Sequence, residues 1–519
     1  MTWLLTILLG LVALVGLPVA REICSGLKSE SGNVMNLFTG GAKRPLRFAG
    51  TWYESDPSKL ARQIEGYIDE AKARLKAHEK ELAGKHILAI IAPHAGYTFS
   101  GQTAACSYLA AKAMKPKRVF LLGPSHYRAF HGAALSADRS LATVFGDLKV
   151  DTECVAELKR SVIFQESTDA HRQEHSLELQ LAFIKAVFGD VKVVPIMLGR
   201  LEDEAEARFI AAEIKSKLTE DDLLVVSSDF THIGPRFDYQ PFGSDWRTKL
   251  TKLDNEAFAF LKQNDLDGFF DFYRRTDDTI CGVYAISVML ALLPDDAVGT
   301  LLDYHTSQES VMEDDDNSVS YGALVFSSPS HWSRETTDQT LSEDDGATLL
   351  KIARSTLDEY VKEGRTAEVN VKLSSRLKSP RGVFVTLYKK GELRGCIGYV
   401  LPIKSLARAV AENAVASASK DYRFETVEPS ELKDIKIEVN VLTAPKRVPS
   451  YHDIRIGTDG IFMHCQGKQS VFLPSVASEY GWTLEKTLEQ LSLKAGLPPD
   501  AWREDAYFEV FQSQAFEEH

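Results

Sequence analysis

The chain has 519 residues, of which 44% are hydrophobic and 26% charged, a composition typical of a globular protein with two or three domains. Its formal net charge of -13 argues against a nucleic-acid-binding surface as the main functional feature, so no nucleic-acid partner is expected. The six cysteines are scattered and form no C-x-x-C pair, which argues against a disulfide scaffold or a zinc knuckle.

Residues 1–20 form an apolar N-terminal segment, with a dense Leu, Ile and Val run from Trp3 to Val19. Its length is at the lower limit for a membrane span and long for a signal-peptide core. Basic residues follow the segment and none precedes it, so the positive-inside rule predicts an anchor that leaves the domains cytoplasmic. Two alternatives are export through a cleaved signal and a soluble cytoplasmic protein that starts at Met35. Residues 21–43 form a leader.

Residues 44–328 alternate predicted helices and strands. The order of strand, helix and strand predicts an α/β fold with a mostly parallel central sheet flanked by helices. Helices are expected at 58–82, 103–114, 204–218 and 253–261, and strands at 87–92, 191–198, 222–228 and 318–327, with one more from Arg118.

Two of these strands end in a proline followed by a histidine. The first runs into A-P-H-A-G-Y, which contains His94 and Tyr97, and the strand from Arg118 runs into G-P-S-H, which ends at His126. In open α/β sheets, ligands bind at the carboxyl ends of the strands. Histidines on two equivalent strand ends therefore predict convergent ligands of a metal ion.

Three further polar clusters stand at the ends of predicted elements. S-S-D-F-T-H, with Asp229 and His232, follows a strand, and E-H-S-L-E, with His175 and Glu178, opens a helix. T-I-C-G places Cys281 before an apolar helix, whose dipole would stabilise a thiolate suited to metal binding or nucleophilic attack. His175 and Glu178 stand three residues apart, so local helix capping is an equal alternative for them.

The five motifs, in the chain order A-P-H-A-G-Y, G-P-S-H, E-H-S-L-E, S-S-D-F-T-H and T-I-C-G, resemble the Memo family over residues 44–328. The resemblance implies a fold like that of the class III extradiol dioxygenases, non-haem iron enzymes that open catechol rings. Those enzymes hold iron(II) with two histidines and a glutamate. In Memo-like proteins, the resemblance implies, a cysteine replaces the glutamate. The metal ligands would then be His94, His126 and Cys281, with His232 at the position of the acid–base histidine and Asp229 close by.

The chemistry of this ligand set favours a redox metal. Two imidazoles and a thiolate leave coordination positions open, as in catalytic centres, and the thiolate favours iron, copper or zinc over magnesium. We expect iron(II), with copper or zinc as alternatives, and a small metal-chelating, catechol-like substrate. His175, Glu178 and Tyr97 are expected around the ligands or in the pocket. The alternative to a dioxygenase-like oxidoreductase is a non-catalytic scaffold whose pocket binds a metal or a peptide.

Residues 329–341 are rich in Ser and Thr and predict a linker, and residues 342–519 predict a C-terminal α+β domain. A capping-box-like start at Ser342 precedes a helix, and alternation over 435–441 indicates a strand.

The motifs L-R-G-C-I-G, D-Y-R-F and F-L-P-S-V-A resemble the AMMECR family from about residue 345 to 512. Domains of this family and of the Memo family often occur alongside a radical-SAM protein, which makes such a protein a candidate partner. Arg394 and Cys396 are candidates for a small-molecule or thiol site on a Gly-flanked loop. The alternative is that Gly395 and Gly398 set the backbone geometry while Cys396 packs inward.

Overall fold

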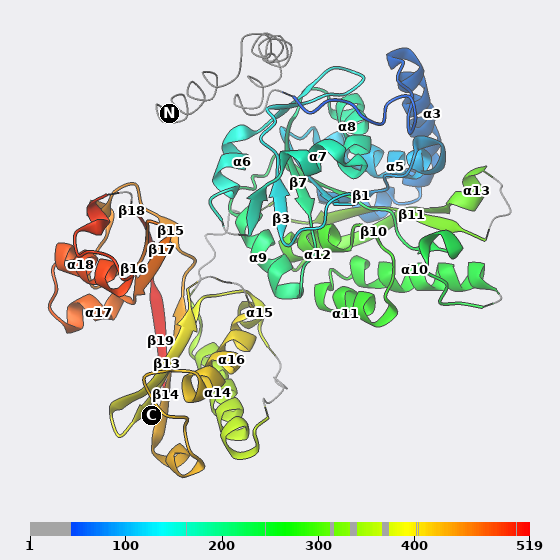
Figure 1. The fold of residues 1–519 in the computed structure, drawn as a ribbon. Coiled ribbons are helices and arrows are strands. Elements are labelled where there is room, and N and C mark those ends of the chain that lie inside the picture. Colours follow the sequence, from blue (N-terminus) through cyan, green and yellow to red (C-terminus); the bar gives the residue numbers. More distant parts are fainter. Residues whose placement is uncertain are drawn as a thin grey trace, which may run out of the picture. The chain divides into compact units, whose positions relative to one another are not determined.

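The computed structural model describes residues 43–518, except for residues 162, 244, 312–315, 333–339, 366–372, 401, 403 and 505. The chain divides into two compact units (Figure 1). The first comprises Met1–Leu201 and Glu213–Ser333, and the second comprises Glu202–Ala212 and Arg334–His519.

The described residues of the first unit form an 11-stranded sheet with the order β10-β11-β1-β8-β2-β7-β3-β6 along its main path. The four central strands, β1, β8, β2 and β7, are parallel, whereas β11 and β10 are antiparallel additions beside β1. The predicted mostly parallel sheet is therefore confirmed. The strands are β1 (His86–Ala92), β2 (Arg118–Pro124), β3 (Ala133–Leu135), β4 (Ser140–Leu141), β5 (Leu148–Val150), β6 (Phe164–Glu166), β7 (Lys192–Leu198), β8 (Asp222–Ser227), β9 (His232–Ile233), β10 (Val298–Thr306) and β11 (Ser318–Ser328).

Helices cover both faces of this sheet (Figure 1), with α3, α5 and α8 packed together on one face and α10, α11 and α12 on the other. The central strands are consequently apolar and buried on both sides. The helices of this part of the chain are α3 (Pro57–Lys76), α4 (Glu79–Leu82), α5 (Tyr97–Ala111), α6 (Thr152–Leu158), α7 (Thr168–Gln173), α8 (His175–Phe188), α9 (Glu204–Lys215), α10 (Trp246–Lys262), α11 (Leu266–Thr276), α12 (Val283–Leu292) and α13 (Ser307–Val311).

Helix α5 begins at Tyr97, six residues before the predicted start at Thr103. The intervening Gly101 lowers helix propensity, so the sequence pattern does not predict this first turn. Packing explains the glycine, because a Cβ atom at Gly101 would lie 2.5 Å from the ring of Tyr67 in α3. The early start places the first turn of α5 directly after the His94 turn.

The second unit contains two four-stranded antiparallel sheets among its described residues, with the orders β13-β12-β14-β19 and β15-β18-β16-β17. Its α14 starts with the predicted capping box between Ser342 and Asp345, and the predicted C-terminal α+β domain is confirmed. The elements are α14 (Glu343–Glu363), α15 (Ser375–Lys378), β12 (Val383–Lys389), β13 (Glu392–Tyr399), α16 (Leu406–Ser419), β14 (Ile435–Leu442), β15 (Lys446–Arg447), β16 (Gly460–Cys465), β17 (Lys468–Phe472), α17 (Pro474–Glu479), α18 (Leu484–Lys494), β18 (Ala506–Phe511) and β19 (Ser513–Glu517).

The prediction of a membrane-associated protein needs correction. Across the described part of the chain, no helix combines the length and the apolar character that crossing a bilayer requires. The apolar segment 1–20, on which the prediction of an anchor rested, lies outside the described residues, as does Met35.

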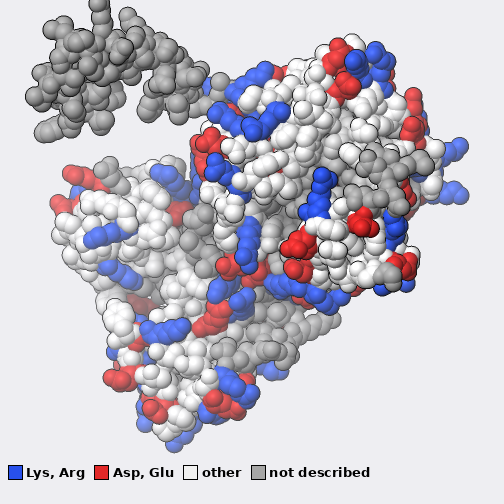
Figure 2. All heavy atoms as spheres, turned by 45° about the vertical axis from the view of Figure 1, so that its right-hand side comes forward, with Lys and Arg blue, Asp and Glu red and all other residues white. Residues whose placement is uncertain are grey.

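Acidic and basic side chains are interspersed over the face of the molecule that Figure 2 shows. No patch of a single sign dominates that face. The expectation that nucleic acid is not a partner stays a prediction.

Candidate metal centre

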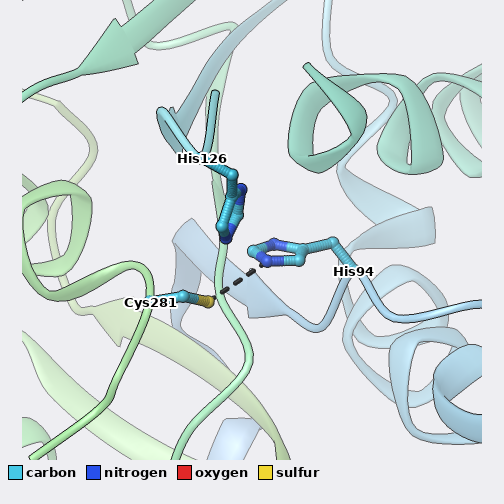
Figure 3. Close-up of side chains that lie close together, drawn as sticks. All are labelled: His94, His126 and Cys281. Carbon is cyan, nitrogen blue, oxygen red and sulfur yellow. Dashed lines mark hydrogen bonds between the residues drawn. The ribbon is translucent and has the colours of Figure 1, made fainter. Parts of the chain in front are cut away.

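Three chain segments bring His94, His126 and Cys281 together (Figure 3). His94 follows β1, His126 follows β2, and Cys281 precedes α12. One potential ligand atom from each residue lies within 4.8 Å of the others, and Nε2 of His94 is 3.1 Å from Sγ of Cys281. The three residues proposed as ligands from the sequence are therefore neighbours in space.

The sheet register explains this convergence. β1 pairs with β8 in parallel up to Ala92 and Ser227, so the turn at His94 emerges beside Ser228 and Asp229. The backbone N–H of Gly282 donates to Oγ of Ser228 over 3.0 Å, which fixes the start of α12 against the same turn. A Cβ atom at residue 282 would lie only 2.4 Å from Ser228, so this close approach requires glycine.

Hydrogen bonding determines which ring nitrogen of His94 is free. Its Nδ1 lies 2.9 Å from Oγ of Ser227, and that hydroxyl already donates its single proton to the carbonyl of Ser176 over 2.6 Å. Ser227 therefore accepts from Nδ1–H, and the lone pair of His94 lies on Nε2, which faces Cys281. Burial and the neighbouring His126 hold the pKa of His94 well below its ordinary value, so the ring is neutral.

Glu174 likewise determines which ring nitrogen of His126 is free. Its carboxylate accepts Nδ1–H of His126 over 2.8 Å and the backbone N–H of His126 over 2.7 Å. It also accepts the N–H of Ser176 over 3.0 Å, as the N-cap of α8. Although burial alone would raise it, these bonds hold the pKa of Glu174 at about 2, so the group is an anion that leaves Nε2 of His126 free.

Cys281 is a protonated thiol in this environment. Burial, followed by the charge of Asp229, raises its pKa well above the ordinary value, and this outweighs the helix dipole expected to stabilise a thiolate. The backbone N–H of Asp229 points at Sγ from 3.2 Å and would stabilise the thiolate that a bound cation creates by displacing the proton.

His232 lies close to these residues, on the short strand β9. Its Nδ1–H donates to the carbonyl of Phe230 over 2.9 Å, so its Nε2 also carries a lone pair. Burial lowers the pKa of His232 and keeps the ring neutral. Oδ1 of Asp229 accepts the backbone N–H of His94 over 2.7 Å and that of Ala95 over 3.3 Å, so Asp229 fixes the histidine turn.

His175 stacks on the ring of His126, with centroids 4.3 Å apart, and also contacts Trp52, with centroids 4.5 Å apart. The residue is 7% exposed, and its Nδ1 lies 3.3 Å from Oε1 of Glu174 but forms no hydrogen bond with the described residues. Burial, with the neighbouring His94 and His126, lowers its pKa to about 2. His126, Glu174 and His175 also form a second group of closely spaced donor atoms, although the hydrogen bonds to Glu174 already occupy its carboxylate.

Glu178 and Tyr97 are placed away from the ligand atoms. The buried Glu178 carboxylate forms an ion pair with Arg44 at 2.7 Å and accepts from the hydroxyl of Tyr53 and the backbone of Phe48. The hydroxyl of Tyr97 donates to the carbonyl of Leu179. Both residues hold α8 in position, and α8 in turn carries Glu174 and His175 at its start.

Sequence reasoning missed three residues that support the centre: Glu174, Ser227 and Arg44. Glu174 and Ser227 open two of the recognised motifs and Arg44 lies far from all of them, but the role of each depends on a partner more than 40 residues away. For Glu174 the available signal was an acidic residue immediately before a helix, a common position for an N-cap.

In the second unit, Arg394 and Cys396 play different parts. Arg394 holds Glu431 through two hydrogen bonds of 3.0 Å, and it also donates to the carbonyls of Glu425 and Thr426. Cys396 is partly exposed, and its Sγ accepts from the hydroxyl of Thr386 over 3.3 Å. Arg394 is therefore fully occupied in fixing the chain, whereas the thiol remains available.

Comparison with known proteins identifies both parts of the chain. The family model described as Memo-like protein matches residues 44–325, and the AMMECR1 model matches residues 350–516. The memo-1 homologue of Caenorhabditis elegans is 31% identical over 60% of this chain and 90% of its own. A Methanothermobacter thermautotrophicus protein is 43% identical over 34% of this chain and 96% of its own. The crystal structure of PH0010 from Pyrococcus horikoshii is 35% identical, with a TM-score of 0.34, over 34% of this chain and 94% of its own.

Proposed function

Because the chain belongs to the Memo family, we propose that it is a metal-dependent redox protein in which His94, His126 and Cys281 hold one transition-metal ion. One observation carries the proposal. Hydrogen bonds from Nδ1 leave Nε2 of both histidines unprotonated, and Nε2 of His94 faces the thiol at 3.1 Å. Ligating histidines are commonly oriented in this way by a second hydrogen bond.

The residues fit a soft or borderline divalent ion. Two neutral imidazoles and one thiolate give a centre of net charge +1 for such an ion, with the Glu174 carboxylate behind His126. We expect iron(II), with copper or zinc as the alternatives. A bound ion would supply open coordination positions that polarise a chelating substrate.

The substrate that this site suits is small, planar and able to chelate, as a catechol is. The ring of His175 lies against His126, and Trp52 lies against His175. His232 is neutral, because burial lowers its pKa, and its free Nε2 can accept a proton from a substrate hydroxyl. The resemblance of the family to class III extradiol dioxygenases supports this substrate class, while the cysteine distinguishes the donor set from that of the ring-cleaving enzymes.

Metal analysis of the full chain tests the proposal. Protein purified without oxygen should bind one equivalent of iron(II), copper or zinc, and His94→Ala and Cys281→Ala should each lose it. Cys396→Ala removes a partly exposed thiol from the other unit and should retain the full equivalent. Binding of no transition metal by the wild type, or full retention by Cys281→Ala, would refute the metal centre.

Oxygen uptake then separates catalysis from binding. With the iron-loaded protein and a series of catechols, wild type should consume oxygen and His232→Asn should consume it at least about tenfold more slowly, since general acid–base groups contribute 10²–10⁴-fold. Stoichiometric metal without any turnover would instead support the non-catalytic scaffold.

A further inference from the structure

A second cluster of chemically capable side chains lies in the C-terminal unit, on the outer face of its first sheet. The register of β13, β12, β14 and β19 aligns Cys396, Thr386, Glu438 and Glu517 in one row across the four strands. Their neighbours along the strands, such as Val385 and Val439, point into the core beneath α14 and α16. The row therefore lies on the side of the sheet opposite the helices, where Thr386 is 5% exposed and Cys396 is partly exposed.

Cys396 is held firmly in this row. Its backbone N–H donates to Oδ2 of Asp421 over 2.9 Å, and its Sγ accepts from the hydroxyl of Thr386. A Cβ atom at Gly395 would lie 2.1 Å from the carbonyl of Ser417, so glycine allows α16 to pack tightly behind the thiol. The glycines of the motif thus set the backbone geometry, as one alternative proposed, but Cys396 faces away from the core.

Two cations, Arg423 and Lys494, interact electrostatically with the thiol. Arg423 donates to the carbonyl of Cys396 over 3.4 Å and pairs with Asp421 at 2.7 Å. Lys494 donates to the carbonyl of Val471 over 2.9 Å and lies over the ring of Phe472 at 4.8 Å. Partial burial of the amine, together with the neighbouring Arg423, lowers the pKa of Lys494. Among the described residues, no carboxylate lies within ion-pair distance of Lys494.

Aromatic rings continue this surface beyond Lys494. Phe472 meets Trp482 at 5.7 Å, and Trp482 stacks on Tyr480 at 4.8 Å with an angle of 18°. Tyr480 is 67% exposed, so the stack presents an open ring. Val471 and Leu473, on either side of Phe472, pack against one hydrophobic cluster together with Phe384, which stands two residues before Thr386 on the same face of β12. The segment that carries Phe472 and the strand that carries Thr386 are therefore joined through this cluster.

The far end of the row has the opposite charge. Glu438 and Glu517 are paired across β14 and β19, and burial together with Glu517 and Glu479 raises the pKa of Glu438. This acidic end excludes long polyanions such as nucleic acid. A compact oxyanion beside Arg423 and Lys494 avoids it, because Glu438 lies two strand spacings, roughly 10 Å, from Cys396.

We propose that residues Cys396, Thr386, Arg423 and Lys494 form a thiol face that binds a small molecule through an oxyanion, a carboxylate or a phosphate. The oxyanion lies between the two cations, next to Sγ of Cys396, and a planar portion extends over Phe472 and Trp482. Arg423 and Lys494 interact electrostatically, and among the described residues Asp421 is the one carboxylate paired with either of them. Binding of an oxyanion supplies the missing negative charge. This site is separate from the metal centre and does not depend on its function.

Charged thiol reagents test this proposal on the full chain. Three methanethiosulfonates, carrying a sulfonate, a neutral methyl group or a trimethylammonium group, form mixed disulfides with a thiol and release methanesulfinate. The rate at Cys396 is followed by mass spectrometry of its peptide. Relative to the urea-unfolded chain, we expect the anionic reagent to react about tenfold faster than the cationic one, since both cations interact electrostatically with Cys396.

Matched variants identify which cations cause the preference of Cys396 for the anionic reagent. Lys494→Gln and Arg423→Gln should each reduce it, whereas Lys446→Gln on β15 should leave it unchanged. Equal relative rates in the folded and unfolded chains, or a preference that survives Lys494→Gln and Arg423→Gln together, would overturn the proposal.

Protection of Cys396 from the neutral reagent distinguishes the two kinds of oxyanion. Protection by inorganic phosphate but not by acetate or succinate assigns a phosphate-bearing ligand, and the reverse assigns a carboxylate. Absence of protection by any of these anions at saturating concentration overturns the binding site. Loss of metal binding in these variants is not expected, so failure here is distinguishable from failure of the metal centre.

Discussion

Replacing Glu174 by Gln tests whether its carboxylate sets the tautomer of His126. The carboxylate accepts three N–H groups: the ring and the backbone of His126, at 2.8 and 2.7 Å, and the backbone of Ser176, at 3.0 Å. A Gln side chain has one oxygen and one NH2 group, so one of these donors must face another donor. Either a backbone N–H loses its acceptor or the ring proton moves to Nε2, the atom that would bind the metal.

We expect this change to weaken metal binding by 10–100-fold, the usual effect of removing a group that orients a ligating histidine. The corresponding loss of binding free energy is about 1.4–2.7 kcal/mol. Competition with a chromophoric chelator measures the affinity, and circular dichroism establishes that the variant is folded.

Glu178→Gln is the matched control, one turn further along α8. Glu178 contacts Arg44 and Tyr53 rather than a histidine, so its loss should lower the stability and weaken metal binding by the folded protein much less than Glu174→Gln does. If Glu178→Gln fails to fold, Tyr53→Phe replaces it as the control, because it removes only a single hydrogen bond to Glu178. Wild-type affinity in Glu174→Gln, or an equal loss in both variants, would contradict the assigned role of the carboxylate.

Three further outcomes are expected. Burial raises the pKa of Asp278 from 3.8 to about 7, so the folded state keeps a proton that the unfolded state has lost. The free energy of unfolding should therefore fall by about 1.4 kcal/mol per pH unit between pH 4 and 7, and urea titrations of Asp278→Asn should lack this part of the slope. Gly395→Ala should lower the free energy of unfolding measured by urea titration by about 1–3 kcal/mol, through its clash with the carbonyl of Ser417, while Gly66→Ala, with no atom within 4 Å, should not. Chelator treatment should lower the unfolding temperature of the wild type but not that of His94→Ala; an equal shift in both would argue against a bound ion at this site.

The sequence was most informative where a rule of topology applied. His94 and His126 could be placed together because parallel strands end at one edge of a sheet, and the register of β1, β8 and β2 brings their turns together. No such rule of topology applied to Cys281. Its position came from family resemblance, and the physical cause, the close approach of Gly282 to Ser228, needs coordinates.

The supporting residues were harder to predict, because their role depends on distant partners. Glu178 looked like a pocket residue, yet its partner is Arg44, 134 positions away in the chain. Arg394 similarly seemed to belong with Cys396, whereas it holds Glu431, and Arg423 is the cation beside the thiol. Local patterns identify residue types suited to chemistry but cannot show which partner each side chain finds.

Arg44 links the first described residues of the chain to the candidate metal centre. Its guanidinium donates to the carbonyls of His171 and Glu174 and pairs with Glu178, and all of these groups are buried. Order in the segment around Arg44 and occupancy of the ion site therefore share a coupling free energy, and such coupling is reciprocal. An ion bound to His126 would tighten the docking of this segment, and release of the segment would loosen the ion by the same factor. Protection of residues 43–53 from proteolysis would thus report whether an ion occupies the site.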